Sequence, residues 1–96
     1  MKTFKTLAEF KRVLSLGDKL HAFHHGNSIM PAKDLGVREV VVKQSNAFAL
    51  KTDKGDGSFG QSWLEYPKAS LAKIDEGKLI VLHQSTGEPL LTYKFV

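Results

Sequence analysis

The stretch Phe59–Ser70 reads Phe-Gly-Gln-Ser-Trp-Leu-Glu-Tyr-Pro-Lys-Ala-Ser, and the rest of the 96-residue chain is arranged around it. It holds the only tryptophan, Trp63, one of the two tyrosines, Tyr66, and a proline, Pro67, that ends the run. The residues before Pro67 are typical of a strand, with hydrophobic hairpins on both sides of it. Because proline has no N–H to give to a ladder, pairing should stop at Pro67 or lie on an edge.

Two interpretations remain for which side chains of this strand point toward the core. Successive side chains of a strand point to opposite faces. If Leu64 points inward, Trp63 faces solvent beside Glu65; the opposite phase buries Trp63 and leaves Tyr66 outside. A lone tryptophan in a domain of this size more often belongs to the core. We therefore predict that Trp63 is buried.

The N-terminal segment predicts a helix over about residues 6–16. Thr6 and Glu9 have the Ser/Thr-x-x-Glu spacing of a capping box, in which each side chain satisfies a free backbone N–H. Gly17 stands where a left-handed residue usually closes a helix. Apolar residues recur on one helical stripe, at Leu7, Phe10 and Leu14.

The rest of the chain predicts strands in hairpin succession. We expect them over about residues 19–25, 38–44, 47–52, 59–66, 78–83 and 89–95. A loop is expected over 26–36, a polar turn over 53–58, and one turn of helix or a small strand over 69–74. Short loops between sequential strands favour an antiparallel meander.

These elements predict one domain over residues 1–96, in the α+β class and mainly β. The N-terminal helix caps a five- or six-stranded, strongly bent antiparallel sheet, or an SH3-like partial barrel, that extends from about residue 19 to residue 96.

Composition excludes several classes of site. The chain has no cysteine, which excludes disulfides, zinc–thiolate sites and thiol nucleophiles. Its longest apolar runs are four residues, too short to span a bilayer. The first residues lack the apolar stretch of a secretory signal. We expect a cytoplasmic protein without a membrane partner.

The positive charge is concentrated near the N-terminus. The formal net charge is +4, with a pI of about 9.4. Residues 1–25 hold five Lys and Arg against two acidic residues, together with three of the four histidines. Such a balance attracts phosphates, although many small domains are as basic with no anionic partner.

The histidines His21, His24 and His25 suggest a metal site, but their spacing opposes it. Residues four apart in a strand are roughly 13 Å apart, and neighbouring side chains point to opposite faces. We expect histidines that are solvated or hydrogen-bonded, and no metal site.

Other ligand and catalytic motifs are also missing. The run Asp53–Ser58 has glycine at the third position of a calcium loop, and Leu64 at the twelfth, where an EF-hand needs glutamate. No phosphate-binding glycine loop precedes a helix, and no Gly-x-Ser-x-Gly turn occurs. We expect no cofactor and no enzyme activity.

Two segments, Gln44–Leu50 and Ser62–Ser70, resemble parts of small, uncharacterised single-domain bacterial proteins of phage and other mobile elements. The likeness covers about a third of the chain, and neither segment is a known catalytic or ligand-binding signature. It implies an accessory role on mobile DNA and no particular chemistry.

The sequence therefore favours a non-catalytic binding module whose mildly basic surface binds nucleic acid, with aromatic side chains stacking on bases. The alternative is a protein-interaction or regulatory module that acts through a sheet edge or as a homodimer. The candidate nucleic-acid-binding residues are Lys11, Arg12, Arg38, Lys43, Trp63, Tyr66 and Lys68.

Overall fold

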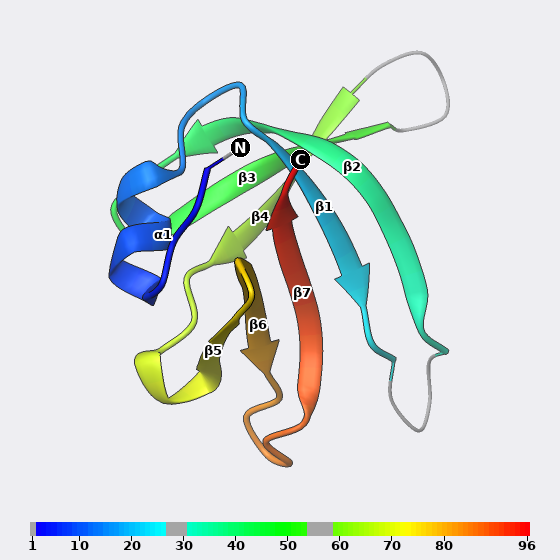
Figure 1. Ribbon diagram of the computed structural model, residues 1–96. Helices are drawn as coiled ribbons and strands as arrows, with labels where there is room; N and C mark the ends of the chain where they lie inside the picture. Colours follow the sequence, from blue (N-terminus) through cyan, green and yellow to red (C-terminus); the bar gives the residue numbers. More distant parts are fainter. Residues whose placement is uncertain (1, 27–30, 54–58) are drawn as a thin grey trace.

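The structure is a computed structural model that describes residues 2–26, 31–53 and 59–96. It has one short α-helix, a 3₁₀ turn and one antiparallel sheet (Figure 1). The elements in chain order are α1 (Leu7–Val13), β1 (Lys19–His24), β2 (Lys33–Lys43), β3 (Ala47–Asp53), β4 (Phe59–Glu65), η1 (Ala69–Leu71), β5 (Ala72–Asp75), β6 (Lys78–Leu82) and β7 (Pro89–Phe95). Residues 54–58 of the predicted turn 53–58, and residues 27–30 of the predicted loop 26–36, lie outside the described residues, and Asp53 is the last residue of β3.

The sheet has seven strands in the order β4-β3-β2-β1-β7-β6-β5. Two meanders, β1 to β4 and β5 to β7, are joined where β7 pairs antiparallel with β1. The mainly β antiparallel prediction is confirmed, but its strand count of five or six was wrong. Residues 69–74, expected as a helical turn or a strand, form both η1 and most of β5, because β5 gains a ladder with β6.

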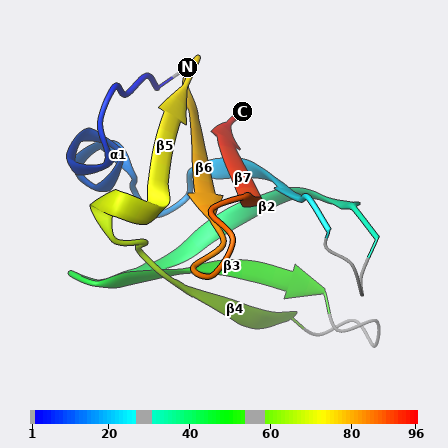
Figure 2. The ribbon, with the colours of Figure 1, turned by 90° about the horizontal axis from the view of Figure 1, so that it is seen from below.

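Strand β2 bends the sheet. Its first half pairs with β1 as far as Glu39, and its second half pairs with β3 from Val40 onward, with an irregularity between Val40 and Val42. Figure 2 shows the result: β3 and β4 run across the direction of β5 and β6. The sheet remains open, with β4 and β5 at its two ends.

The predicted start of this strand, Arg38, was wrong, because β2 begins at Lys33. Local sequence suggested a loop there, since Gly36 and Asp34 favour turns. Pairing with β1 overrides that preference, and Leu35 packs against the core while Gly36 takes a φ of +79° beside a register shift.

Helix α1 begins as predicted and ends early. The Thr6 hydroxyl accepts a bond from the Glu9 N–H at 3.1 Å, and the Glu9 carboxylate accepts one from the Lys5 N–H at 3.0 Å. The helix stops at Val13, so the predicted end at residue 16 was wrong. Lysine side chains, instead of Gly17, satisfy its last carbonyls: Lys2 Nζ bonds to Val13 O at 2.5 Å and Lys43 Nζ to Leu14 O at 2.6 Å.

The core lies inside the bend, and Phe10 of α1 is at its centre. The Phe10 side chain is fully buried. Its ring contacts those of Phe4, Phe48, Tyr66 and Phe95, with centroids 5.0 to 6.5 Å apart. One turn of helix therefore anchors strands from both halves of the sheet.

Candidate nucleic-acid interface

The face of the sheet that points away from the core carries a row of basic side chains. Lys78 of β6 lies directly opposite Lys94 of β7, and Lys94 lies directly opposite His21 of β1. Two like charges opposite each other destabilise a sheet. The register nevertheless aligns Lys78 with Lys94, and Asp75 of β5 lies opposite Lys78 on its other side. The row therefore offers two neighbouring ammonium groups to an anion, with one carboxylate at its β5 end.

The next row on the same face adds polar and aromatic groups. Thr92 lies opposite Phe23, and a ring nitrogen of His25, Nε2, hydrogen-bonds to the Thr92 hydroxyl. The rings of Phe23 and His25 meet edge to face at 5.0 Å. These side chains line a hollow of about 410 Å³ together with Lys78 and Lys94.

His21 is held in place from the neighbouring strand. Its Nε2 lies 2.7 Å from Oδ1 of Asp34, and the same oxygen accepts a bond from the Gly36 N–H at 2.8 Å. The bond from Gly36, followed by that from His21, lowers the pKa of the Asp34 carboxyl below its usual value. Asp34 therefore stays ionised beside the basic row.

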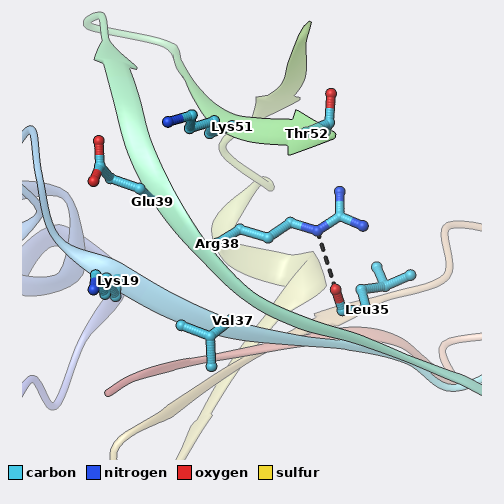
Figure 3. A pocket seen from close by; sticks show the side chains of 7 residues that line it. All are labelled: Lys19, Leu35, Val37, Arg38, Glu39, Lys51 and Thr52. Carbon is cyan, nitrogen blue, oxygen red and sulfur yellow. Dashed lines mark hydrogen bonds between the residues drawn. The ribbon is translucent and has the colours of Figure 1, made fainter. Parts of the chain in front are cut away.

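A second hollow, of about 490 Å³, lies between β2 and β3 just beyond the end of their paired region (Figure 3). Figure 3 shows Glu39 and Arg38 projecting from opposite sides of β2 and Lys51 on the neighbouring β3, with Arg38 Nε donating to the Leu35 carbonyl at 3.1 Å. The remaining lining residues are Lys19, Val37 and Thr52.

A third hollow of about 460 Å³ connects the first two. It shares His21 and Lys94 with the first hollow and Val37 with the second. The three hollows follow one another across β6, β7, β1, β2 and β3. The basic face is defined here as the basic residues of these hollows that lie on the outer side of the sheet, together with Trp63, discussed next: Lys19, His21, Lys51, Trp63, Lys78 and Lys94.

Trp63 is exposed, so the prediction that it is buried was wrong. Its side chain retains 49 % of its accessible surface. Trp63 lies opposite Ala49 of β3 on the outer face, whereas Leu64 lies opposite the buried Phe48. Ala49 is fully buried between its cross-strand partners Val42 and Trp63. The indole therefore rests on a small side chain and keeps a surface open to solvent.

Trp63 and the second hollow are neighbours. Lys51 lies opposite Gln61 on the same face, one step along the ladder from the Ala49–Trp63 pair. Diagonal positions of this kind are within reach of long and aromatic side chains. Trp63 thus ends the basic face at β4.

The other predicted binding residues lie apart from Trp63. Arg38 lies opposite the buried Leu20, on the core side of the sheet, and the rest lie on the helix side. Lys11 Nζ is 5.0 Å from the centroid of the Tyr66 ring, which packs against Phe10 and Phe48. Lys43 is bonded to Leu14 O. Arg12 and Lys68 are exposed.

Tyr66 is half-buried on the core side. Its hydroxyl is buried and has no hydrogen-bond partner among the described residues. Burial raises the pKa of this phenol, so it stays protonated. With its ring among the core aromatics, Tyr66 offers less surface for stacking than Trp63 does.

Metal chemistry has no support in the described part of the chain. No group of three or more His, Asp or Glu side chains there is placed to hold an ion. His24 instead accepts a bond from the Gly26 N–H at 3.0 Å, and His83 from the Ser85 N–H at 3.2 Å. The histidines serve as local hydrogen-bond partners.

Four lysines of the basic face were not predicted from the sequence: Lys19, Lys51, Lys78 and Lys94. They are far apart in sequence, so counting charges segment by segment along the chain does not reveal that they cluster. Alternation in the two C-terminal strands places Lys78 and Lys94 on solvent faces, but their alignment needs the β6–β7 register.

No protein-family model, no curated protein and no solved structure matches this chain. Among the described residues, no helix has the length and apolar character to cross a membrane.

Proposed function

We propose that this chain is a non-catalytic module that binds single-stranded nucleic acid across the basic face. The observation that carries the proposal is the alignment of Lys78, Lys94 and His21 in one row, joined by shared hollows to Lys19 and Lys51. Proteins that bind single strands combine a positive groove for the backbone with an aromatic side chain for the bases. Trp63 supplies the second part.

A single strand suits this surface better than a duplex does. The hollows follow a bent sheet, and the described residues include no exposed helix long enough to fill a major groove. A small, strongly bent sheet of the SH3-like kind offers a platform for such binding, and the accessory role on mobile DNA implied by the resemblance agrees with it. The cytoplasm is the expected location.

The test uses Trp63 as its own reporter, because it is the only tryptophan in the chain. Titrating a single-stranded oligonucleotide should quench its fluorescence, and raising the salt should weaken binding. Each phosphate contact contributes about 0.7 to the slope of log K against log salt for single strands. The variant Lys78→Ala/Lys94→Ala should reduce the magnitude of that slope by about 1.4.

Trp63→Ala tests stacking separately by an assay that needs no tryptophan, such as anisotropy of a labelled oligonucleotide. Stacking is worth about 1–3 kcal/mol per base, so binding should weaken about 5- to 150-fold with an unchanged salt slope. The matched control is Arg12→Ala/Lys68→Ala, which removes the same charge from the helix side. Absence of binding at low salt, or equal weakening by this control, would contradict the proposal.

A further inference from the structure

The free edge of β4 carries a second kind of binding surface. Strand β4 lies at the end of the sheet, and in the described part of the chain only β3 pairs with it. The register of the β3–β4 ladder is continuous over all seven pairs, from Ala47 with Glu65 to Asp53 with Phe59. The other side of β4 therefore presents unpaired backbone groups.

The ladder pattern identifies those groups. The Tyr66 N–H bonds to Asn46 O at 3.1 Å, and bonded pairs alternate along an antiparallel ladder. Leu64 and Ser62 therefore bond to β3, through Phe48 and Leu50. The backbone N–H and C=O groups of Gln61, Trp63 and Glu65 point away from β3, toward the free edge.

This edge lacks the usual protection. Natural edge strands are blunted by charges, prolines, bulges or a covering element. Residues 60–64, Gly-Gln-Ser-Trp-Leu, contain no charge and no proline, and the ladder shows no register shift. An exposed, regular and uncharged edge is a template for another strand.

We infer that this other strand is β4 of a second copy, so that the chain forms a homodimer by antiparallel β4–β4 pairing. The strand is seven residues long, and pairing it with its own reverse centres the two-fold axis on Ser62. Gln61 of one copy is then paired with Trp63 of the other. Each residue whose backbone N–H and C=O point to the free edge therefore faces a residue of the same kind. The full hydrogen-bond ladder forms without a change in either copy.

The side chains also suit a two-fold pairing. The single charge in the described side chains of β4, Glu65, falls opposite position 59 of the second copy, so like charges do not meet. The sheet continues through the axis, with one Trp63 on each side of it on the outer face. Two basic faces would then adjoin, although the pairing itself does not depend on nucleic-acid binding.

The expected dimer is weak. One strand pair buries less than the 1,200–2,000 Å² of a stable interface. We expect a reversible dimer with a dissociation constant of roughly micromolar or weaker, which forms as the protein is concentrated. Sedimentation of the unaltered chain, without nucleic acid, should show its weight-average mass rising from one chain toward two.

A cysteine scan tests the register, because the chain has no cysteine of its own. On the axis, Ser62 forms a non-hydrogen-bonded pair with itself, with Cα atoms about 4.5 Å apart, within the range of a disulfide. Ser62→Cys should therefore convert to a disulfide-linked dimer under a mild oxidant. Ser70→Cys, an exposed control on η1, should stay largely monomeric.

Three results would overturn the inference. One is a chain that sediments as a monomer at all concentrations up to about millimolar. Another is Ser70→Cys cross-linking as fast as Ser62→Cys. The third is Gln61→Cys cross-linking faster than Ser62→Cys, which would reject the register. None of these results bears on nucleic-acid binding, which the salt titration tests in its own right.

Discussion

The two ends of the sheet differ in how they are protected. Strand β5 has four residues, two of them the exposed and charged Lys73 and Asp75, and helix α1 packs beside it (Figure 2). Strand β4 has seven residues, no charge at positions 60–64 and no covering element in the described structure. One end is closed against further pairing, and the other is open.

The difference teaches that a short helix can protect an edge that is far from it in sequence. Helix α1 has only seven residues, too few to be stable alone. Its packing on the aromatic core holds it near β5. Protection of β5 therefore depends on tertiary contacts, whereas the openness of β4 follows from the lack of charge at its positions 60–64.

The largest effect should come from Phe10→Ala, which removes the anchor of α1. Burial of Phe10 is complete, and large-to-small changes at such sites cost about 3–5 kcal/mol. Denaturant unfolding should show this loss, and amide exchange should rise more in β5 than in β4. The exposed Leu16→Ala should change stability by less than about 0.5 kcal/mol. Equal exchange in both strands would contradict the protective role of α1.

A pair of proline variants tests the open edge. The Ser62 N–H belongs to the β3–β4 ladder, and the Gln61 N–H points to the free side. Ser62→Pro should therefore destabilise the monomer by about 1–3 kcal/mol more than Gln61→Pro, because it leaves a ladder carbonyl unpaired. Gln61→Pro should abolish the concentration-dependent rise in mass while the chain stays folded. Equal stability of the two variants would contradict the assigned alternation.

Loss of the helix cap should give a smaller effect at the closed end. The Thr6 hydroxyl accepts from the Glu9 N–H, and removing such a cap costs about 1 kcal/mol. Thr6→Ala should lower the free energy of unfolding by that amount, whereas Thr6→Ser should retain most of it. A loss shared by both variants would show that the methyl group, and not the cap, is responsible.

The smallest effect on stability is expected at the start of β2, where the strand pairs with β1 and pairing with β3 has not yet begun. The pKa of Asp34 is lowered in the folded chain by bonds from Gly36 and His21. Its contribution to stability is therefore present above its unfolded pKa of about 3.9, and is lost as the pH falls through the lower folded value. Asp34→Asn should lower the urea midpoint slightly at pH 7 and leave it unchanged at the acid end. A larger difference at low pH would contradict this sign.

Several features were predictable from the sequence because they depend on near neighbours. The cap at Thr6 needs only Glu9 three residues later, and the strand Pro89–Phe95 was predicted with its observed bounds by alternation alone. In the candidate site, Trp63 is the predicted binding residue that lies on the basic face, whereas Arg38 lines the second hollow from the core side of the sheet. The mainly β antiparallel class followed from short loops between alternating segments.

Other features were decided by the tertiary structure, because they depend on partners distant in the chain. Trp63 is exposed since Leu64 of the same strand meets Phe48 in the core, and alternation alone does not select the phase. Helix α1 ends at Val13 because Leu14 takes an extended conformation, and lysines from residues 2 and 43 bond to the last carbonyls. The Lys78–Lys94–His21 row exists only through the register of three strands. Alternation along a strand determined which of its residues share a face. The pairing of strands distant in sequence decided which face is buried and which residues of different strands became neighbours.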